Sequence, residues 1–169
     1  FIGYNQPIWV GDNFEEYVKS GYQFNSDLYA IISYRANMAQ KLSIGLKIDG
    51  EEVENHPALD ILKNPNPAST LDDIIESFFI WYALSGNFYL YKARVGDRAP
   101  VQLYAMPPAH TEILAGTWQQ PVKGFRIRNW FNDDMPAKDV IHVRSFNPSQ
   151  SPSTGEGLYG QSPLMAARR

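Results

Sequence analysis

Cysteine is absent from the 169 residues of this chain. Its absence excludes disulfides, thiolate metal sites, iron–sulfur clusters and cysteine nucleophiles from the sequence, and it fits a reducing compartment. An excess of positive charge is also lacking, because 15 Lys and Arg stand against 18 Asp and Glu, a formal net charge of −3. A compact non-specific binder of DNA or RNA is therefore not expected, since such binding depends on cations that displace counterions from phosphates.

Long apolar runs are missing as well. The most apolar stretch, 77–91, is shorter than a membrane span and is interrupted by Ser85, Gly86 and Asn87. Neither a transmembrane helix nor a signal peptide is predicted. What the chain does contain is 44% hydrophobic residues, which is enough for the core of one domain or one large subdomain.

Apolar periodicity predicts two long helices. The first runs over 27–42 and is capped by Asn25 or Ser26. The second runs over 71–84, where Thr70 and Asp73 approximate a capping box. Its second half has no polar side, so we expect burial nearly all round.

Shorter elements fill the rest of the chain. Alternation over 44–48 followed by Asp49 and Gly50 predicts a hairpin, and a short helix over 57–62 ends at the Asn-Pro-Asn-Pro run at 64–67. Strands are predicted at 88–92, 101–105, 111–114, 122–128 and 140–143. Helices followed by a run of strands indicate an α+β fold with amphipathic helices on a mostly antiparallel sheet.

The chain divides into four parts on these patterns. We expect an N-terminal segment of unclear role at 1–24, an α+β domain at 25–146 and a flexible loop at 147–161. Ser162 and Pro163 then begin a helix that reaches only its second turn by Arg169, so 162–169 is interpreted as the start of a long helix in a longer protein.

A search for phosphate-binding and nucleophile motifs finds one literal match. Residues 155–160 fit the glycine pattern of dinucleotide-binding turns, but a polar loop of eight residues stands where a strand is required, so a hinge is favoured. The chain contains neither a G-x-x-x-x-G-K-[ST] loop nor a G-x-S-x-G elbow.

The three histidines, His56, His110 and His142, lie far apart and do not have metal-ligand spacing. His110 and Glu112 match the first half of a zinc deaminase signature whose second half needs cysteines. For His142, a hydrogen-bonded structural role on its strand is favoured over proton transfer.

Charged clusters have structural explanations too. Lys123, Arg126 and Arg128 alternate near Trp130 and Phe131, a combination used by single-stranded nucleic acid binders, although a solvated strand face is favoured. The carboxylate clusters follow a hairpin turn, open a helix or lie in a turn: Glu51, Glu52 and Glu54; Asp72, Asp73 and Glu76; Asp133 and Asp134. We therefore assign no catalytic, cofactor-binding or metal-ligating residue and expect no enzyme and no cofactor.

The order of local features resembles the N-terminal wing region of phage portal proteins of the HK97 type. The resemblance covers the chain from about residue 25 to its end, without the first two dozen residues. In its first half it rests on 27–32 with Ala36 and Ala39, on 56–59 with Leu62, on 64–66 and on 85–90. In its second half it rests on 101–104 before the prolines at 107–108, on 139–143 and on 157–164. The loop at 149–154 departs from the family pattern.

The resemblance implies a structural subunit of a ring, typically of twelve copies, at one capsid vertex of the virion. Double-stranded DNA would be packaged and ejected through this ring, and terminase, the major capsid protein and a head-tail adaptor would be partners, with assembly in the host cytoplasm and no membrane contact. By itself, the 169-residue chain is expected to be monomeric or weakly associated, because the family's stem and clip carry much of the lateral contact.

Two alternatives remain open at this stage. One is a different protein-binding or nucleic-acid-binding module that uses the face of Lys123, Arg126, Arg128 and Trp130. The other is a non-catalytic part of a larger enzyme.

Overall fold

A computed structural model describes residues 7–8, 25–128, 134–148 and 156–164. Its helices are α2 (Ser26–Gln40), α3 (Pro57–Lys63) and α4 (Leu71–Ser85), with short 3-10 turns at Ala137–Asp139 and Glu156–Leu158. Its strands are β1 (Pro7–Ile8), β2 (Leu46–Ile48), β3 (Glu51–Val53), β4 (Asn87–Ala93), β5 (Gln102–Met106), β6 (Thr111–Ala115), β7 (Val122–Ile127), β8 (Met135–Pro136) and β9 (Val140–Arg144). The α+β class is confirmed.

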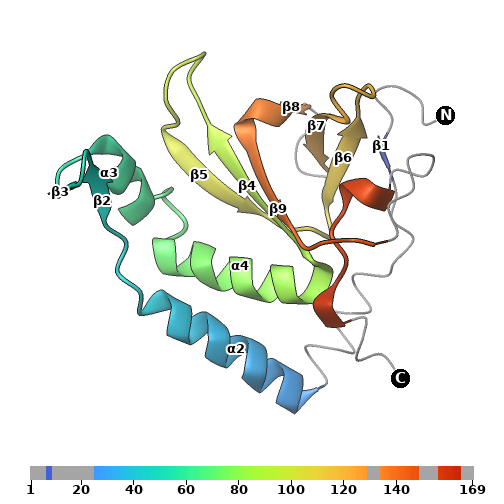
Figure 1. The fold of residues 1–169 in the computed structure, drawn as a ribbon, viewed down its shortest axis with the longest axis horizontal. Helices are drawn as coiled ribbons and strands as arrows, with labels where there is room; N and C mark the ends of the chain where they lie inside the picture. Colours follow the sequence, from blue (N-terminus) through green and yellow to red (C-terminus); the bar gives the residue numbers. More distant parts are fainter. Residues whose placement is uncertain (1–6, 9–24, 129–133, 149–155, 165–169) are drawn as a thin grey trace.

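The described strands form three antiparallel sheets. One has the order β5-β4-β9, one has the order β1-β6-β7-β8, and β2 pairs with β3 in a separate hairpin. Figure 1 shows α4 lying along the three-stranded sheet and α2 lying on the far side of α4. The order of layers is thus α2, α4, the three-stranded sheet and the four-stranded sheet.

Strand β4 separates two apolar cores because its side chains alternate between the faces of the sheet. Phe88 packs with Ile74 of α4 and Leu103 of β5 on one face. Tyr89 packs on the other face, in a cluster that reaches the four-stranded sheet through Ile113. Both faces of the three-stranded sheet are therefore covered along this strand.

Local signals place the helices close to their predicted positions. The side chain of Asn25 caps α2 by accepting the N–H of Leu28 at 3.0 Å. Thr70 and Asp73 form the complete capping box of α4, with Asp73 Oδ2 accepting the N–H of Thr70 at 2.7 Å. Aspartate thus performs the role that glutamate or glutamine usually has.

The second half of α4 has no exposed side, in line with the expectation that it is buried nearly all round. Residues 78–83 are half-buried and Leu84 is buried. The helix lies between α2 and the three-stranded sheet (Figure 1).

Candidate functional site: a polar junction at the end of helix α4

Segment 157–162, near the end of the described residues, is held by many hydrogen bonds where α4 ends, β4 begins and β9 ends. We call this region the polar junction. Besides segment 157–162, it comprises Ser85, Gly86, Asn87, His142, Arg144 and Ser145. In Figure 1 the C-terminal part of the described chain runs past the C-terminal end of α4.

Asn87 is the centre of the polar junction and is only 5% exposed. Its Nδ2 donates to the carbonyl oxygens of Ser85 at 2.8 Å and Gly160 at 3.2 Å. Its Oδ1 accepts the N–H of Gly160 at 2.6 Å and lies 3.0 Å from Nε2 of His142. One amide side chain therefore fixes both backbone groups of a residue 73 positions away.

The hydrogen-bond pattern assigns the tautomer of His142. Since Asn87 uses Nδ2 for two carbonyls, its Oδ1 is an acceptor, and the ring must donate to it through Nε2–H. The ring stacks on Tyr89 with 4.4 Å between centroids. Burial, with Arg144 as a second cause, lowers the pKa of His142 to about 4. The hydrogen-bonded position predicted for His142 is confirmed, and at neutral pH the ring is uncharged.

Two glycines let the backbones meet in the polar junction. Gly86 caps α4 with φ +72, in the left-handed region that favours glycine. A Cβ on Gly86 would meet the carbonyl group of Gln161, and a Cβ on Gly160 would meet the carbonyl oxygen of Gly86 and the backbone nitrogen of Ser145. Neither position has room for a side chain.

The end of β9 also holds the segment. Arg144 donates from Nη1 to the carbonyl oxygen of Gly157, and Ser145 donates from Oγ to that of Gln161. The N–H of Ser145 donates to the carbonyl oxygen of Gly86 at 2.8 Å. The segment is thus joined to β9 and to the end of α4 together.

Contacts at either end of the segment extend this attachment. The hydroxyl of Tyr159 accepts the N–H of Ile113 in β6 at 3.0 Å, and burial raises the pKa of Tyr159 to about 12. The hydroxyl of Ser162 donates to the carbonyl oxygen of Ala83 at 3.3 Å. Segment 157–162 is therefore bonded to α4 and to both larger sheets.

The described residues include the start of the predicted C-terminal helix. Ser162 Oγ accepts the N–H of Leu164 at 3.2 Å, as the predicted N-cap requires. Residues 165–169 lie outside the described part, so the helix beyond this cap remains a prediction. Of the flexible loop predicted at 147–161, residues 149–155 also lie outside the described part. Residues 157–161 are hydrogen-bonded to the domain, contrary to the flexibility and the hinge predicted there.

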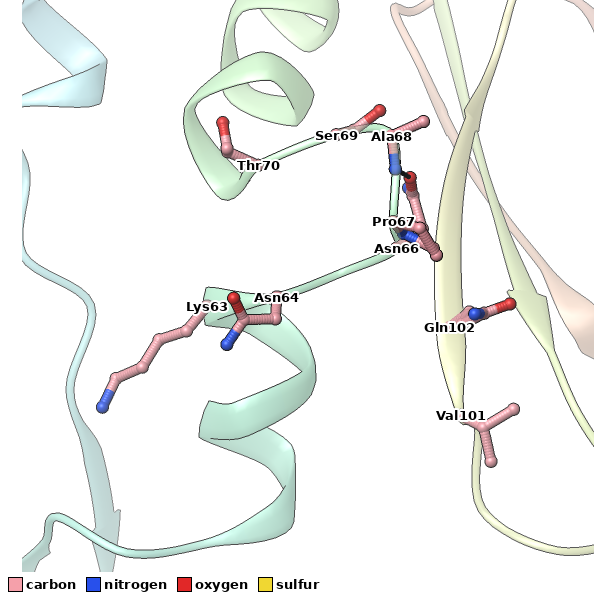
Figure 2. A pocket seen from close by; sticks show the side chains of 9 residues that line it. All are labelled: Lys63, Asn64, Asn66, Pro67, Ala68, Ser69, Thr70, Val101 and Gln102. Atoms are coloured by element: carbon pink, nitrogen blue, oxygen red, sulfur yellow. Dashed lines mark hydrogen bonds between the residues drawn. The ribbon is translucent and has the colours of Figure 1, made fainter.

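A hollow of about 600 Å³ lies between the end of α3, the turn at 65–70 and the start of β5 (Figure 2). Asn66 shapes it: its Oδ1 accepts the N–H of Ala68 at 2.9 Å and its Nδ2 donates to the carbonyl oxygen of Leu103 at 2.6 Å. The N–H of Leu103 donates to Pro65 at 2.8 Å. These bonds satisfy the edge of β5, and the surrounding side chains are mostly exposed, so the hollow is explained by the turn.

The remaining histidines are separate from the polar junction. His56 is the N-cap of α3, where Nδ1 accepts the N–H of Ala58 at 3.1 Å. His110 is exposed and lies in the turn before β6. Among the described residues, no group of three His, Asp or Glu side chains is placed to hold a metal ion.

The described carboxylates of the three clusters lie at exposed helix and strand ends, except Glu76, which is half-buried in α4 and accepts from Nε2 of Gln40 at 3.5 Å. Glu52 pairs with Lys47 across the hairpin at 3.5 Å, with both side chains more than half exposed. Asp73 belongs to the capping box, whose hydrogen bonds from Thr70 lower its pKa. Asp133 lies outside the described residues, and Asp134 pairs with Arg126 at 2.7 Å.

The predicted basic strand face is largely neutralised. Besides the Arg126 pair, Arg128 Nε lies 2.8 Å from Oε1 of Glu112, whose side chain is 11% exposed. The alternation is also interrupted, because β7 carries one extra residue: Leu114 faces Gly124 whereas Ala115 faces Val122. Trp130 and Phe131 lie outside the described residues.

Sequence reasoning missed Asn87 and Ser145 as partners of the glycine segment. Both stretches, 85–90 and 157–164, carry the family resemblance, but nothing in either stretch says that they touch. The literal dinucleotide pattern is also explained, since Glu156–Leu158 forms a 3-10 turn and Gly160 is closely packed. Gly155 lies outside the described residues.

No described helix is long and apolar enough to cross a membrane. Solved structures with a similar fold come from gene transfer agent (GTA) particles. The chain matches a chain in the neck of an empty GTA particle with C6 symmetry at a TM-score of 0.83 and 22% identity, covering 98% of this chain and 44% of that one. It matches a chain in the virion of a native GTA particle at 0.78 and 20% identity, covering 98% and 42%.

Comparison of sequences finds a relative and a family. A protein of Rickettsia bellii (strain RML369-C), described as uncharacterized, is 26% identical over 125 residues, which is 70% of this chain and 30% of that protein. The chain thus spans less than half the length of the relatives and structures it matches. The family model described as phage portal protein matches residues 26–169, so the chain belongs to the phage portal protein family.

Proposed function

We propose that this chain is the wing-like part of a portal subunit, a structural component of a ring through which double-stranded DNA enters and leaves a virus-like particle. The observation that carries the proposal is the family match over residues 26–169. The same fold in a GTA neck structure supports it. A location in the virion follows from this role, and assembly would take place in the host cytoplasm.

The polar junction gives the domain a mechanical role in such a ring. Segment 157–162 is bonded to α4, β4, β6 and β9, so a displacement of the chain that follows it is passed to the layers as a unit. Dense hydrogen bonding of a half-buried segment resists local opening. The junction would thus keep the domain in a fixed orientation to the rest of the subunit.

The charges suit a conduit that does not grip DNA. The chain has a net charge of −3, and Arg126 and Arg128 are paired with carboxylates. A net negative charge disfavours association with a polyanion. DNA binding should be weak and should fall further with salt.

The absence of enzymatic activity is part of the proposal. Terminase, the major capsid protein and a head-tail adaptor are the partners that a portal role implies, with terminase supplying ATP hydrolysis. The described residues offer no metal cluster, and the uncharged His142 is committed to Asn87. We expect the purified protein to show no ATPase, nuclease or hydrolase turnover.

Electron microscopy and light scattering of the protein as its gene encodes it test the proposal. Closed rings of uniform subunit number, typically twelve, are expected. DNA titrations at low and physiological salt should show only weak, salt-sensitive binding. A protein that stays monomeric at high concentration, or that binds DNA tightly at physiological salt, would contradict the portal role.

A further inference from the structure

Helix α2 has two apolar faces, of which only one is covered. Ile32, Ala36 and Ala39 are buried on the side that packs on α4. A second apolar row is exposed, and we call it the α2 stripe. It consists of Ile31, Tyr34, Met38 and Leu42, which are 59%, 67%, 47% and 70% exposed.

The α2 stripe follows helical spacing. Its members are three, four and four residues apart, so the three within the helix lie on one side, with Leu42 just beyond its end. Figure 1 shows α2 as the outermost layer, with α4 on one side of it only. The stripe is therefore a continuous surface and not a set of scattered side chains.

Charge is nearly absent from α2, which is unusual for a helix at the surface. Only two of its 15 residues are charged. Asp27 is in the first turn, and Arg35 is placed over the ring of Phe79 in α4, 6.0 Å from its centroid. A helix that faces water normally carries charged residues opposite its buried side. An apolar and uncharged outer side is typical of a surface that is covered in the assembled protein.

We propose that the α2 stripe packs against a second copy of this chain in the assembled ring. The inference rests on the proposed function, in which copies associate laterally. Permanent interfaces between subunits are apolar at their centre and depleted in charged residues, as this stripe is. Identical copies also carry the same net charge of −3, so a contact through uncharged side chains avoids juxtaposing like charges.

The mode of contact follows from ring geometry. In a closed ring, each copy uses two different surfaces, one toward each neighbour. The α2 stripe would be one of them and would meet a different surface of the next copy. A reagent attached to the stripe should therefore join one copy to the next repeatedly, whereas a two-fold contact would stop at pairs.

The absence of cysteine permits a direct test. A single cysteine is introduced by Met38→Cys in the protein as its gene encodes it, labelled with benzophenone maleimide and irradiated after assembly. Trp118→Cys is the matched control, because Trp118 is 88% exposed and lies in the turn before β7, away from α2. We expect a ladder of covalent oligomers from position 38 and monomers from position 118.

The outcomes separate the two proposals. Rings whose position 38 gives only monomer-sized products, or links to a different protein of the particle, would overturn the α2 stripe as a contact between copies and leave the portal role intact. If the unsubstituted protein forms no ring, the proposed function fails, and this inference fails with it.

A second measurement needs no label. Met38→Lys should raise the protein concentration required for ring assembly at least tenfold, whereas Trp118→Lys should leave it unchanged. Both side chains are exposed, so circular dichroism spectra and thermal midpoints should match those of the unsubstituted protein. Unchanged assembly of the Met38→Lys protein would count against the proposal.

Discussion

Two asparagines hold backbone in the same way near opposite ends of the three-stranded sheet, but they differ in burial. Asn66 bonds to Ala68 and to Leu103 of β5, beside an open hollow. Asn87 bonds to Ser85 and Gly160 and is 5% exposed. The first ties a surface turn to β5, and the second joins the domain to segment 157–162.

The difference in burial decides how much each asparagine contributes to the stability of the folded chain. When a side-chain partner is removed at the surface, water replaces it and the loss is small. When the partner is removed inside, the backbone groups left behind have neither water nor protein to bond with. The polar junction should therefore be far less tolerant of substitution than the Asn66 turn.

The largest loss of stability is expected for a substitution at Gly86. Gly86→Ala should destabilise the domain by more than about 4 kcal/mol, because the added Cβ meets the backbone of Gln161 in addition to the strain of a positive φ. Gly96 is a matched control, with φ +66 and nothing within 4 Å of its Cβ position. Gly96→Ala should lower the free energy of unfolding by only about 1–2 kcal/mol, because it adds backbone strain but no close contact. Chemical denaturation measures both, and equal losses would show that close approach in the junction is unimportant.

The second largest effect on stability is expected for Asn87→Ala. It should lower the free energy of unfolding by about 3 kcal/mol, because it leaves both backbone groups of Gly160 and the carbonyl of Ser85 without this partner. Hydrogen exchange should increase at the N–H of Gly160 well before it increases in β4. A global loss without any local change at Gly160 would contradict the role of Asn87 as the link.

The pH dependence of stability tests the electrostatics of the polar junction. His142 has a pKa of about 4 in the folded chain, below its ordinary value of 6.5. Between these values the unfolded chain binds a proton that the folded chain does not, so stability falls as the pH is lowered from 6.5 toward 4. We expect the free energy of unfolding to fall by about 2 kcal/mol when the pH is lowered from 7 to 5.

Denaturant unfolding at the two pH values measures this loss, and His142→Gln is the control. Glutamine does not titrate, so the variant should show a much flatter profile over the same interval. The same slope in both proteins would assign the dependence to another group.

The smallest loss of stability is expected for a substitution at Asn66. Asn66→Ala should lower the free energy of unfolding by about 1 kcal/mol, because Asn66 is only half-buried and lies beside an open hollow, where water can replace its bonds to Ala68 and Leu103. Thermal unfolding of this variant beside Asn87→Ala compares the two ends of the sheet directly. A loss at Asn66 as large as that at Asn87 would remove the contrast between surface turn and buried link.

Local structure could be predicted well from the sequence. The caps at Asn25 and Thr70 and the turn at Asp49 and Gly50 depend on interactions within a few residues, and the five main strands are marked by residue type within each segment. All are confirmed. Strands β1 and β8 were not predicted, since each has two residues and exists only through its neighbour in the sheet.

Long-range pairing was decided by the tertiary structure alone. The sequence marks Asn87 as following a helix end and Gly160 as part of a glycine pattern, but the two are bonded only because α4, β4 and β9 end at one place. The same holds for the uncovered side of α2. A single element's pattern states which residues avoid water, whereas the partner that excludes the water is fixed by how the elements meet in space.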